Sequence, residues 1–237
     1  MGGQACVFYG AAEFSRDTDI VVLAAPDNLD RLTAALDALQ AECIAVPPFE
    51  PKYLARGHAV QFRCREGETD GMRIDLMSVL RGVAAFDELW ERRTTLEDRE
   101  GTRIELISLP DLVRAKKTQR DKDWPMLRRL VETHIVQHQA DPNPARIRFW
   151  LEECRSPTRL MELAKRYPDE AAQLVATRLL LSLAGRQLEL PLAEELAGEE
   201  QREREADRAY WAPLKAELEQ LRHARRMDRS AEKLRPE

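Results

Sequence analysis

The sequence is short of glycine, of clustered cysteine and of long apolar runs, and each shortage argues against a class of protein. Only 10 of the 237 residues are glycine, while leucine, alanine, glutamate and arginine are plentiful, so the composition favours helix. The four cysteines are scattered without a C-x-x-C pair, which favours reduced thiols over a zinc site or disulfides. No apolar run approaches the length of a membrane span, so we expect a cytoplasmic protein with no membrane partner.

Charge is abundant but unevenly distributed. The formal net charge of −5 argues against a protein whose whole surface coats nucleic acid, although it leaves room for a local basic patch. One such patch, here called the basic island, runs from Arg114 to Arg129 and holds seven basic residues against two acidic ones. A long charged helix expected near the C-terminus carries four more arginines that either contact RNA or form a solvated helix end: Arg222, Arg225, Arg226 and Arg229.

Two aspartates precede an apolar run near the start of the chain. Asp17 and Asp19 lead into Ile20-Val21-Val22-Leu23, a run typical of a buried strand. Because residues i and i+2 of a strand share one face, the two carboxylates project together and repel unless a cation lies between them. Mg²⁺ binds one or two carboxylates and completes its shell with water and phosphate oxygens. The pattern therefore predicts a magnesium site, although Asp-x-Asp alone is also common in loops and helix caps.

The remaining periodicity predicts an α+β fold with a small mixed sheet followed by a mostly helical region. Leucines at helical spacing predict a helix within residues 24–42, capped by Asp27 or Asn28, and a second helix is expected over 84–93. Period-two alternation predicts an antiparallel hairpin over 58–78 and a further strand over 102–109. The Pro- and Asn-rich segment 139–145 places a domain boundary, giving a first domain of residues 1–140 and a helical region of residues 141–237.

The N-terminal aspartates belong to a longer pattern, G-G-x-A…G…S-x-D-x-D. It is matched by Gly2, Gly3, Ala5, Gly10, Ser15, Asp17 and Asp19. This pattern resembles the nucleotidyltransferase superfamily that includes DNA polymerase β, and more closely the bacterial nucleotidyltransferases of the abortive-infection and toxin type. Relatives often carry an arginine two positions before the serine, where this chain has Glu13.

The resemblance implies a second group of site residues. A lone aspartate on another strand completes the metal triad in the family, and Asp75 in the alternating segment 72–79 matches it. Two Mg²⁺ ions would then be held by Asp17, Asp19 and Asp75. The nucleotide would be bound by Gly2, Gly3 and Ser15. Basic residues would bind it as well, because the family has a lysine on a helix followed by the motif R-x-K-D, and the matching residues here are Lys116, Arg120 and Lys122. On their own, these basic residues also fit a solvated helix end, with Asp123 as the N-cap of a following helix.

The implied activity is transfer of a nucleoside monophosphate from a nucleoside triphosphate to a hydroxyl group. The acceptor would be RNA, such as transfer RNA, or a protein, with a small molecule such as an aminoglycoside as a further alternative. A toxin or defence role would add an antitoxin partner. Two other interpretations stay open: a catalytically impaired scaffold that binds nucleotide or a partner protein, and an unrelated α+β domain in which the acids are caps. In the family a strand precedes the glycine pair. Since only Met1 precedes Gly2 here, we expect either a start further upstream or a missing strand.

Overall fold

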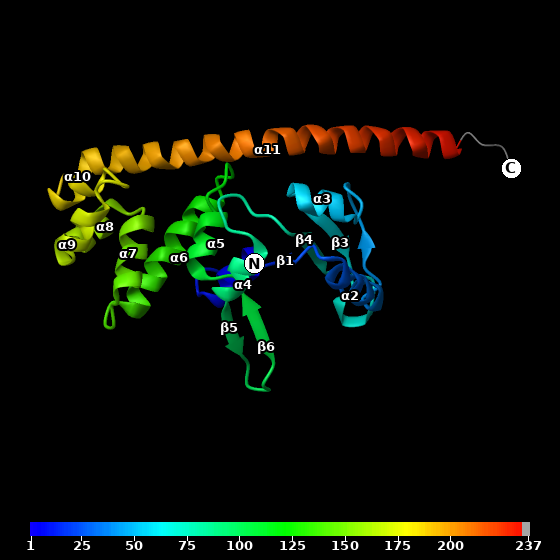
Figure 1. Cartoon of the computed structure of the whole chain (residues 1–237), viewed down its shortest axis with the longest axis horizontal. Helices are drawn as coiled ribbons and strands as arrows, with labels where there is room; N and C mark the ends of the chain where they lie inside the picture. The colour runs from blue at the N-terminus through cyan, green and yellow to red at the C-terminus, as the bar shows by residue number, and fades with distance from the viewer. Residues whose placement is uncertain (234–237) are drawn as a thin grey trace. The chain divides into compact units, whose positions relative to one another are not determined.

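The computed structural model describes the backbone of residues 1–233 and the side chains of residues 1–227. It divides into two compact units. Figure 1 shows the helices and strands of the chain, coloured by residue number. The first unit contains Met1–Ala5, Phe14–Ser108 and the chain from Ala209 on, and the second contains Cys6–Glu13 and Leu109–Arg208. The boundary expected between residues 140 and 141 therefore falls inside the second unit.

A four-stranded mixed sheet forms the centre of the first unit. Its strands are β1 (Asp17–Val21), β2 (Glu42–Cys43), β3 (Val60–Arg63) and β4 (Arg73–Met77), in the order β1-β4-β3-β2. Strands β1 and β4 are parallel, whereas β3 pairs antiparallel with both β4 and β2. The predicted hairpin over residues 58–78 is confirmed as β3 and β4, and the small mixed sheet of the expected α+β fold is confirmed with it.

One face of this sheet packs against the helix α2 (Pro26–Ala38). Leu29 and Leu36 of α2 meet Phe62, Ile74 and Leu76 in a single hydrophobic cluster. The predicted side-chain cap of α2 is wrong, because the helix begins after Ala25 with Pro26 in its first turn. The side chain of Asn28 instead donates to the carbonyl of Leu23, at 2.8 Å.

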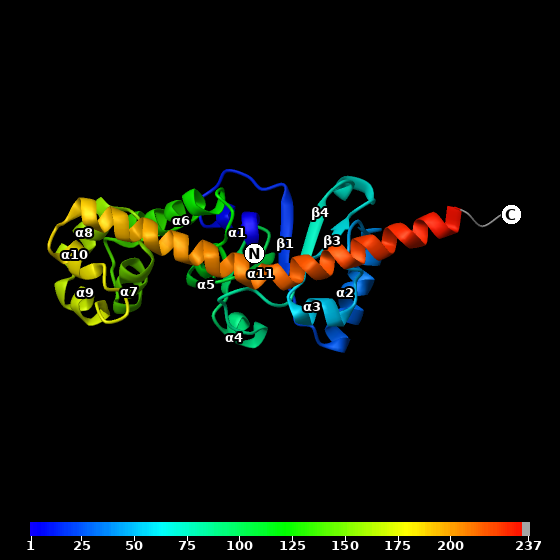
Figure 2. The same cartoon turned by 90° about the horizontal axis from the view of Figure 1, so that it is seen from above.

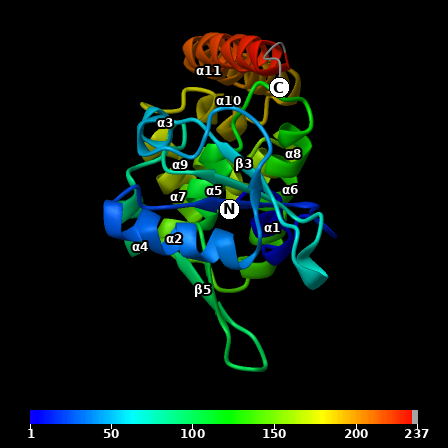
Figure 3. The ribbon, with the colours of Figure 1, turned by 90° about the vertical axis from the view of Figure 1, so that its right-hand side faces the viewer.

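Shorter elements complete the first unit. They are the helices α3 (Pro51–Arg56) and α4 (Phe86–Glu91), the 3-10 turn η1 (Gly67–Thr69), and a separate antiparallel pair, β5 (Thr94–Glu97) with β6 (Arg103–Leu106), whose first strand Figure 3 labels. The second half of the long helix α11 (Glu189–Lys233) contacts the segment after α3. There the Nε2 atom of buried His58 lies 2.8 Å from Oε2 of Glu217, and the Oε1 atom of Glu217 accepts from Arg56.

The second unit is all helical. Its helices are α5 (Leu109–Ala115), α6 (Asp123–His138), α7 (Pro144–Glu153), α8 (Pro157–Arg166), α9 (Pro168–Leu174) and α10 (Leu181–Gly185), with the first part of α11, as Figure 2 shows. Helix α1 (Gly2–Phe8), like α11, contributes residues to both units. The helical C-terminal region is thus confirmed, and α11 continues through Pro213, although a proline inside a helix usually kinks or breaks it. No helix in the described part of the chain is long and apolar enough to cross a membrane.

Candidate functional site

The three predicted metal carboxylates lie on one face of two neighbouring strands. In the parallel pairing of β1 with β4, Asp17 is in register with Arg73, and Asp19 with Asp75. Partners in register point to the same side of a sheet, and so do residues two apart on one strand. Asp17, Asp19 and Asp75 therefore share one face. The strand periodicity predicted this for the first two, and the resemblance for the third.

Asp75 is the most enclosed of the three carboxylates and is held by two neighbours. Only 8% of the residue is exposed, and its Oδ1 and Oδ2 atoms each accept a hydrogen bond of 3.0 Å from the guanidinium of Arg73. Gln61, its partner on β3, donates to Oδ2 at 3.4 Å. The hydrogen bonds to Asp75 raise the pKa of Arg73 against the opposing effect of burial, and the charges of Asp17 and Asp19 add to the rise.

Arg73 was not among the predicted site residues, although the alternation of its strand indicates its position. Arg73 stands two residues before Asp75 on an alternating strand, so the two side chains had to share a face. The guanidinium supplies the positive charge that the carboxylates need in the structure. A cation bound by Asp75 would have to replace the two hydrogen bonds from Arg73.

The glycine pair packs directly against Asp19 of β1 and against Ser15, which precedes the strand. A Cβ atom on Gly2 would lie 1.8 Å from Oδ2 of Asp19, and one on Gly3 would lie 2.3 Å from Oγ of Ser15. The N–H of Gly3 donates to Oδ2 of Asp19 at 3.3 Å, and the hydroxyl of Ser15 donates to the carbonyl of Asp17 at 3.0 Å. Gly2, Gly3 and Ser15 thus position the start of β1, and the N–H predicted to hold phosphate is directed at Asp19.

The donor set suits Mg²⁺, since it consists of carboxylates on one face beside close-packed backbone. As the side chains stand, however, no group of three or more His, Cys, Asp or Glu residues within the described chain is arranged to hold a metal ion. At the carboxylate face both oxygens of Asp75 accept hydrogen bonds from Arg73. The residue types and the shared face fit the metal, and Arg73 must move for Asp75 to bind it.

The predicted phosphate-binding residues belong to the second unit and converge on an acid. Helix α5 ends at Ala115, so Lys116 and Arg120 lie in the turn that follows it, and Lys116 is not on a helix as the resemblance implied. They bind the carboxylate of Asp123 instead, with Lys116 Nζ at 3.3 Å and Arg120 Nε at 2.6 Å, and the hydroxyl of Thr118 adds a third hydrogen bond at 2.5 Å. Asp123 is buried and is the first residue of α6, so the prediction that it caps the helix is wrong.

The rest of the basic island is also largely engaged. Lys117 donates to Glu153 at 3.0 Å and Arg128 to Glu200 at 2.9 Å. Lys122, the third predicted phosphate ligand, is exposed just before α6. Most of these positive charges therefore neutralise acids of the same unit, and the island is less cationic than its sequence suggests.

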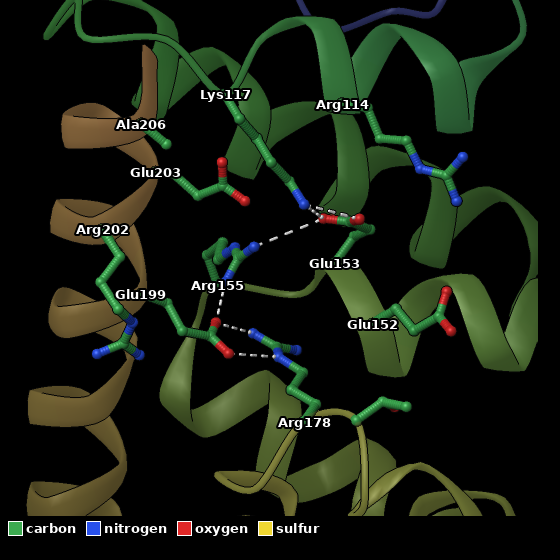
Figure 4. A pocket seen from close by; sticks show the side chains of 11 residues that line it. Arg114, Lys117, Glu152, Glu153, Arg155, Arg178, Glu199, Arg202, Glu203 and Ala206 are labelled. Carbon is green, nitrogen blue, oxygen red and sulfur yellow. Dashed lines mark hydrogen bonds and ion pairs between the residues drawn. The ribbon is translucent and has the colours of Figure 1, made fainter. Parts of the chain in front are cut away.

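A cavity of about 560 Å³ in the second unit shows the same pairing of charges (Figure 4). Glu199 of α11 accepts from Arg178 at 2.8 and 3.1 Å and also from Arg155, while Arg178 donates in addition to the carbonyls of Leu151 and Cys154. Since these buried arginines are held by acids and carbonyls of neighbouring helices, they fix the helices of this unit to one another.

No protein-family model matches the chain, and no curated protein matches it either. A functional assignment therefore depends on the residues, their geometry and the resemblance in motif.

Proposed function

We propose that this protein is a Mg²⁺-dependent nucleotidyltransferase that moves a nucleoside monophosphate from a nucleoside triphosphate to a hydroxyl group. The proposal is carried by one observation. Asp17, Asp19 and Asp75 share one face of two adjacent parallel strands. The close packing of Gly2 and Gly3 on Asp19 and Ser15 supports it, because it gives the glycine pair of the motif a steric reason.

In this proposal Asp17 and Asp19 would hold Mg²⁺ on the triphosphate, and Asp75 would hold the second Mg²⁺ and align the attacking hydroxyl. When bound, Mg²⁺ neutralises charge on the attacking and leaving oxygens of an in-line displacement, so no Ser-His pair is needed. Lys116, Arg120 and Lys122 remain predicted phosphate ligands on the strength of the motif. For Lys116 and Arg120, that role requires release from Asp123, to which both are bound here.

The acceptor we propose is RNA or a protein hydroxyl in the cytoplasm, and an antitoxin partner would accompany a toxin role. None of the four cysteines forms a disulfide, which supports a reducing compartment. The engagement of most of the basic island with acids weakens the case for that island as an RNA surface.

A second candidate function is a nucleotidyltransferase-like scaffold without catalysis. It is favoured by the bidentate ion pair between Arg73 and Asp75, which satisfies Asp75 without a metal. The two candidates differ in one observable, because only the enzyme turns over triphosphate in the presence of Mg²⁺.

The deciding experiment incubates the full chain with each labelled nucleoside triphosphate, Mg²⁺ and total bacterial RNA or lysate. The Asp17→Ala/Asp19→Ala variant should give no labelled product, while a control that removes two exposed aspartates of α2, Asp27→Ala/Asp30→Ala, should match the unmutated chain. Sensitivity of the label to ribonuclease or to protease identifies the acceptor. A fully active Asp17→Ala/Asp19→Ala protein would refute the assignment, and the absence of label with every triphosphate would favour the scaffold.

A further inference from the structure

A second cavity, of about 320 Å³, lies in the first unit on residues outside the carboxylate face. Three arginines of α11 line one part of it, and a short segment next to β2 lines the other. The lining residues are Ile44, Ala45, Val46, Arg222, Arg225 and Arg226. We call this the arginine cavity. Its volume is at the lower end of those that bind small ligands, which start at roughly 300 Å³.

The arginine side of the cavity is strongly cationic. Arg222, Arg225 and Arg226 stand at i, i+3 and i+4, so they share one face of the helix. Within residues 1–227, whose side chains the structure describes, no acidic residue lines the cavity, and neither Arg222 nor Arg225 has an ion-pair partner. This differs from the cavity in the second unit, where glutamates alternate with the basic residues.

The helix dipole does not account for this cluster. Cations stabilise the C-terminal end of a helix, but the effect is confined to its last turn. Arg222 and Arg226 precede the last residue of α11, Lys233, by more than one turn. Like charges at this spacing repel each other, so the cluster favours a bound anion.

The opposite side of the cavity is apolar. Ile44, Ala45 and Val46 are each half-buried. The N–H of Ile44 already donates to the carbonyl of Gln61 at 2.9 Å, and the carbonyl of Ala45 already accepts from Cys43 at 3.3 Å. What this segment presents is therefore mainly aliphatic surface, which suits a flat, uncharged group.

We propose that the arginine cavity binds a nucleotide, with its phosphate on the guanidinium groups and its base against Ile44–Val46. Guanidinium is the side chain best matched to phosphate, because its planar fork donates two parallel hydrogen bonds. The nucleotide is either free or one unit of a single-stranded RNA. This site does not depend on the proposed transferase activity, since it shares no residue with the carboxylate face.

The test measures binding of a fluorescent single-stranded oligoribonucleotide to the full chain over a range of salt concentrations. The variant Arg222→Gln/Arg225→Gln/Arg226→Gln is compared with Arg31→Gln/Arg99→Gln/Arg186→Gln, which removes the same charge at exposed positions elsewhere. Single-stranded binding loses roughly 0.7 in log–log salt slope per lost phosphate contact, so we expect a slope shallower by about two for three arginines. Affinity should fall at least about tenfold in the first variant only. Equal behaviour of the two variants, or no binding by the unmutated chain, would overturn the proposal.

A second pair of variants tests the apolar side. Ala45→Glu places a carboxylate beside the arginines and should abolish binding, whereas Ala45→Gln adds the same volume without charge and should retain most of it. Competition then separates the two sources of nucleotide. Adenosine monophosphate that competes as well as the oligonucleotide indicates a free nucleotide, and competition by the strand alone indicates RNA. Inorganic phosphate that competes as well as adenosine monophosphate would refute the role of the apolar side.

Discussion

Arg73 and Asp75, two residues apart on β4, form a bidentate ion pair in which Nε and Nη2 each donate at 3.0 Å. The side chain of Asp75 is 12% exposed and that of Arg73 is 34% exposed, so the pair lies at the edge of solvent. Arg73 can therefore move away into water when another cation reaches Asp75. In the transferase proposal it is an internal competitor of the metal.

The first prediction is that Arg73→Gln increases the affinity for a divalent cation. Removal of one positive charge about 4 Å from the ion contributes about 1 kcal/mol in water and more near a protein surface, so we expect at least roughly fivefold tighter binding. Isothermal titration with Mn²⁺ measures this, and Arg103→Gln, at an exposed position of β6, is the matched control. Unchanged affinity in Arg73→Gln would show that the ion pair does not compete, and no binding by either protein would remove the metal site itself.

The second prediction concerns Gly2. A methyl group there collides with Asp19 at 1.8 Å, so Gly2→Ala should abolish transfer about as completely as Asp19→Ala. Gly82 is a control with the same backbone strain, because its φ is +71° against +66° for Gly2, but nothing lies within 4 Å of its Cβ position. Gly82→Ala should cost only the strain, about 1–2 kcal/mol of unfolding free energy, and leave activity unchanged. Equal loss of activity in both variants would contradict the steric argument.

A third prediction is structural and independent of any activity. Asp123→Ala removes the buried acceptor of Lys116, Thr118 and Arg120, so we expect the free energy of unfolding to fall by about 3–5 kcal/mol. Asp121→Ala, at a fully exposed side chain, should cost about 1 kcal/mol or less. Urea unfolding of both variants measures the difference, and similar midpoints would mean that the Asp123 cluster adds nothing to stability.

The same cluster predicts a dependence on pH. Burial alone would raise the pKa of Asp123, but Lys116, Thr118 and Arg120 outweigh it and lower the pKa below the ordinary value of 3.8. A carboxyl with a lowered pKa stabilises the fold fully above its unfolded pKa and loses that contribution as pH falls through the folded value. The stability gap between the unmutated chain and Asp123→Asn should therefore persist at pH 7 and shrink below about pH 4.

A further dependence of stability on pH is expected from His134, a base whose neutral form is favoured in the folded chain. Burial, with the nearby charges of His138 and Arg146, lowers the pKa of His134 to about 4, and Trp150 donates from Nε1 to its Nδ1 atom at 2.8 Å. Between pH 6.5 and about 4 the unfolded chain binds a proton that the folded chain does not, so stability declines over this range as pH falls. Titration of the imidazole by NMR should give a midpoint near 4, and His134→Gln should weaken the pH dependence. A midpoint near 6.5 would contradict this.

Much of the first unit was predictable because its signals are local. Alternation around Phe62 and Ile74 specified a hairpin, and the Asp17/Asp19 spacing specified a common face. Failures came where a neighbour distant in sequence or an irregular turn decides the outcome. Lys116 and Arg120 lie in an irregular turn after α5 that their spacing does not encode, and β5 is recognisable only by its pairing with β6. The steric role of Gly2 appears only once Asp19 is placed beside it.

The path of the chain bears on how deletion mapping of this protein should be interpreted. The chain passes between the two units after Ala5, Glu13, Ser108 and Arg208, so neither unit is a continuous stretch of the gene. A stop codon just after Arg208 spares the second unit and truncates the first, because it removes Glu217, the partner of buried His58, and the arginines of the arginine cavity. Loss of a phenotype on trimming the C-terminus would therefore report on the unit that contains Asp17 and Asp75.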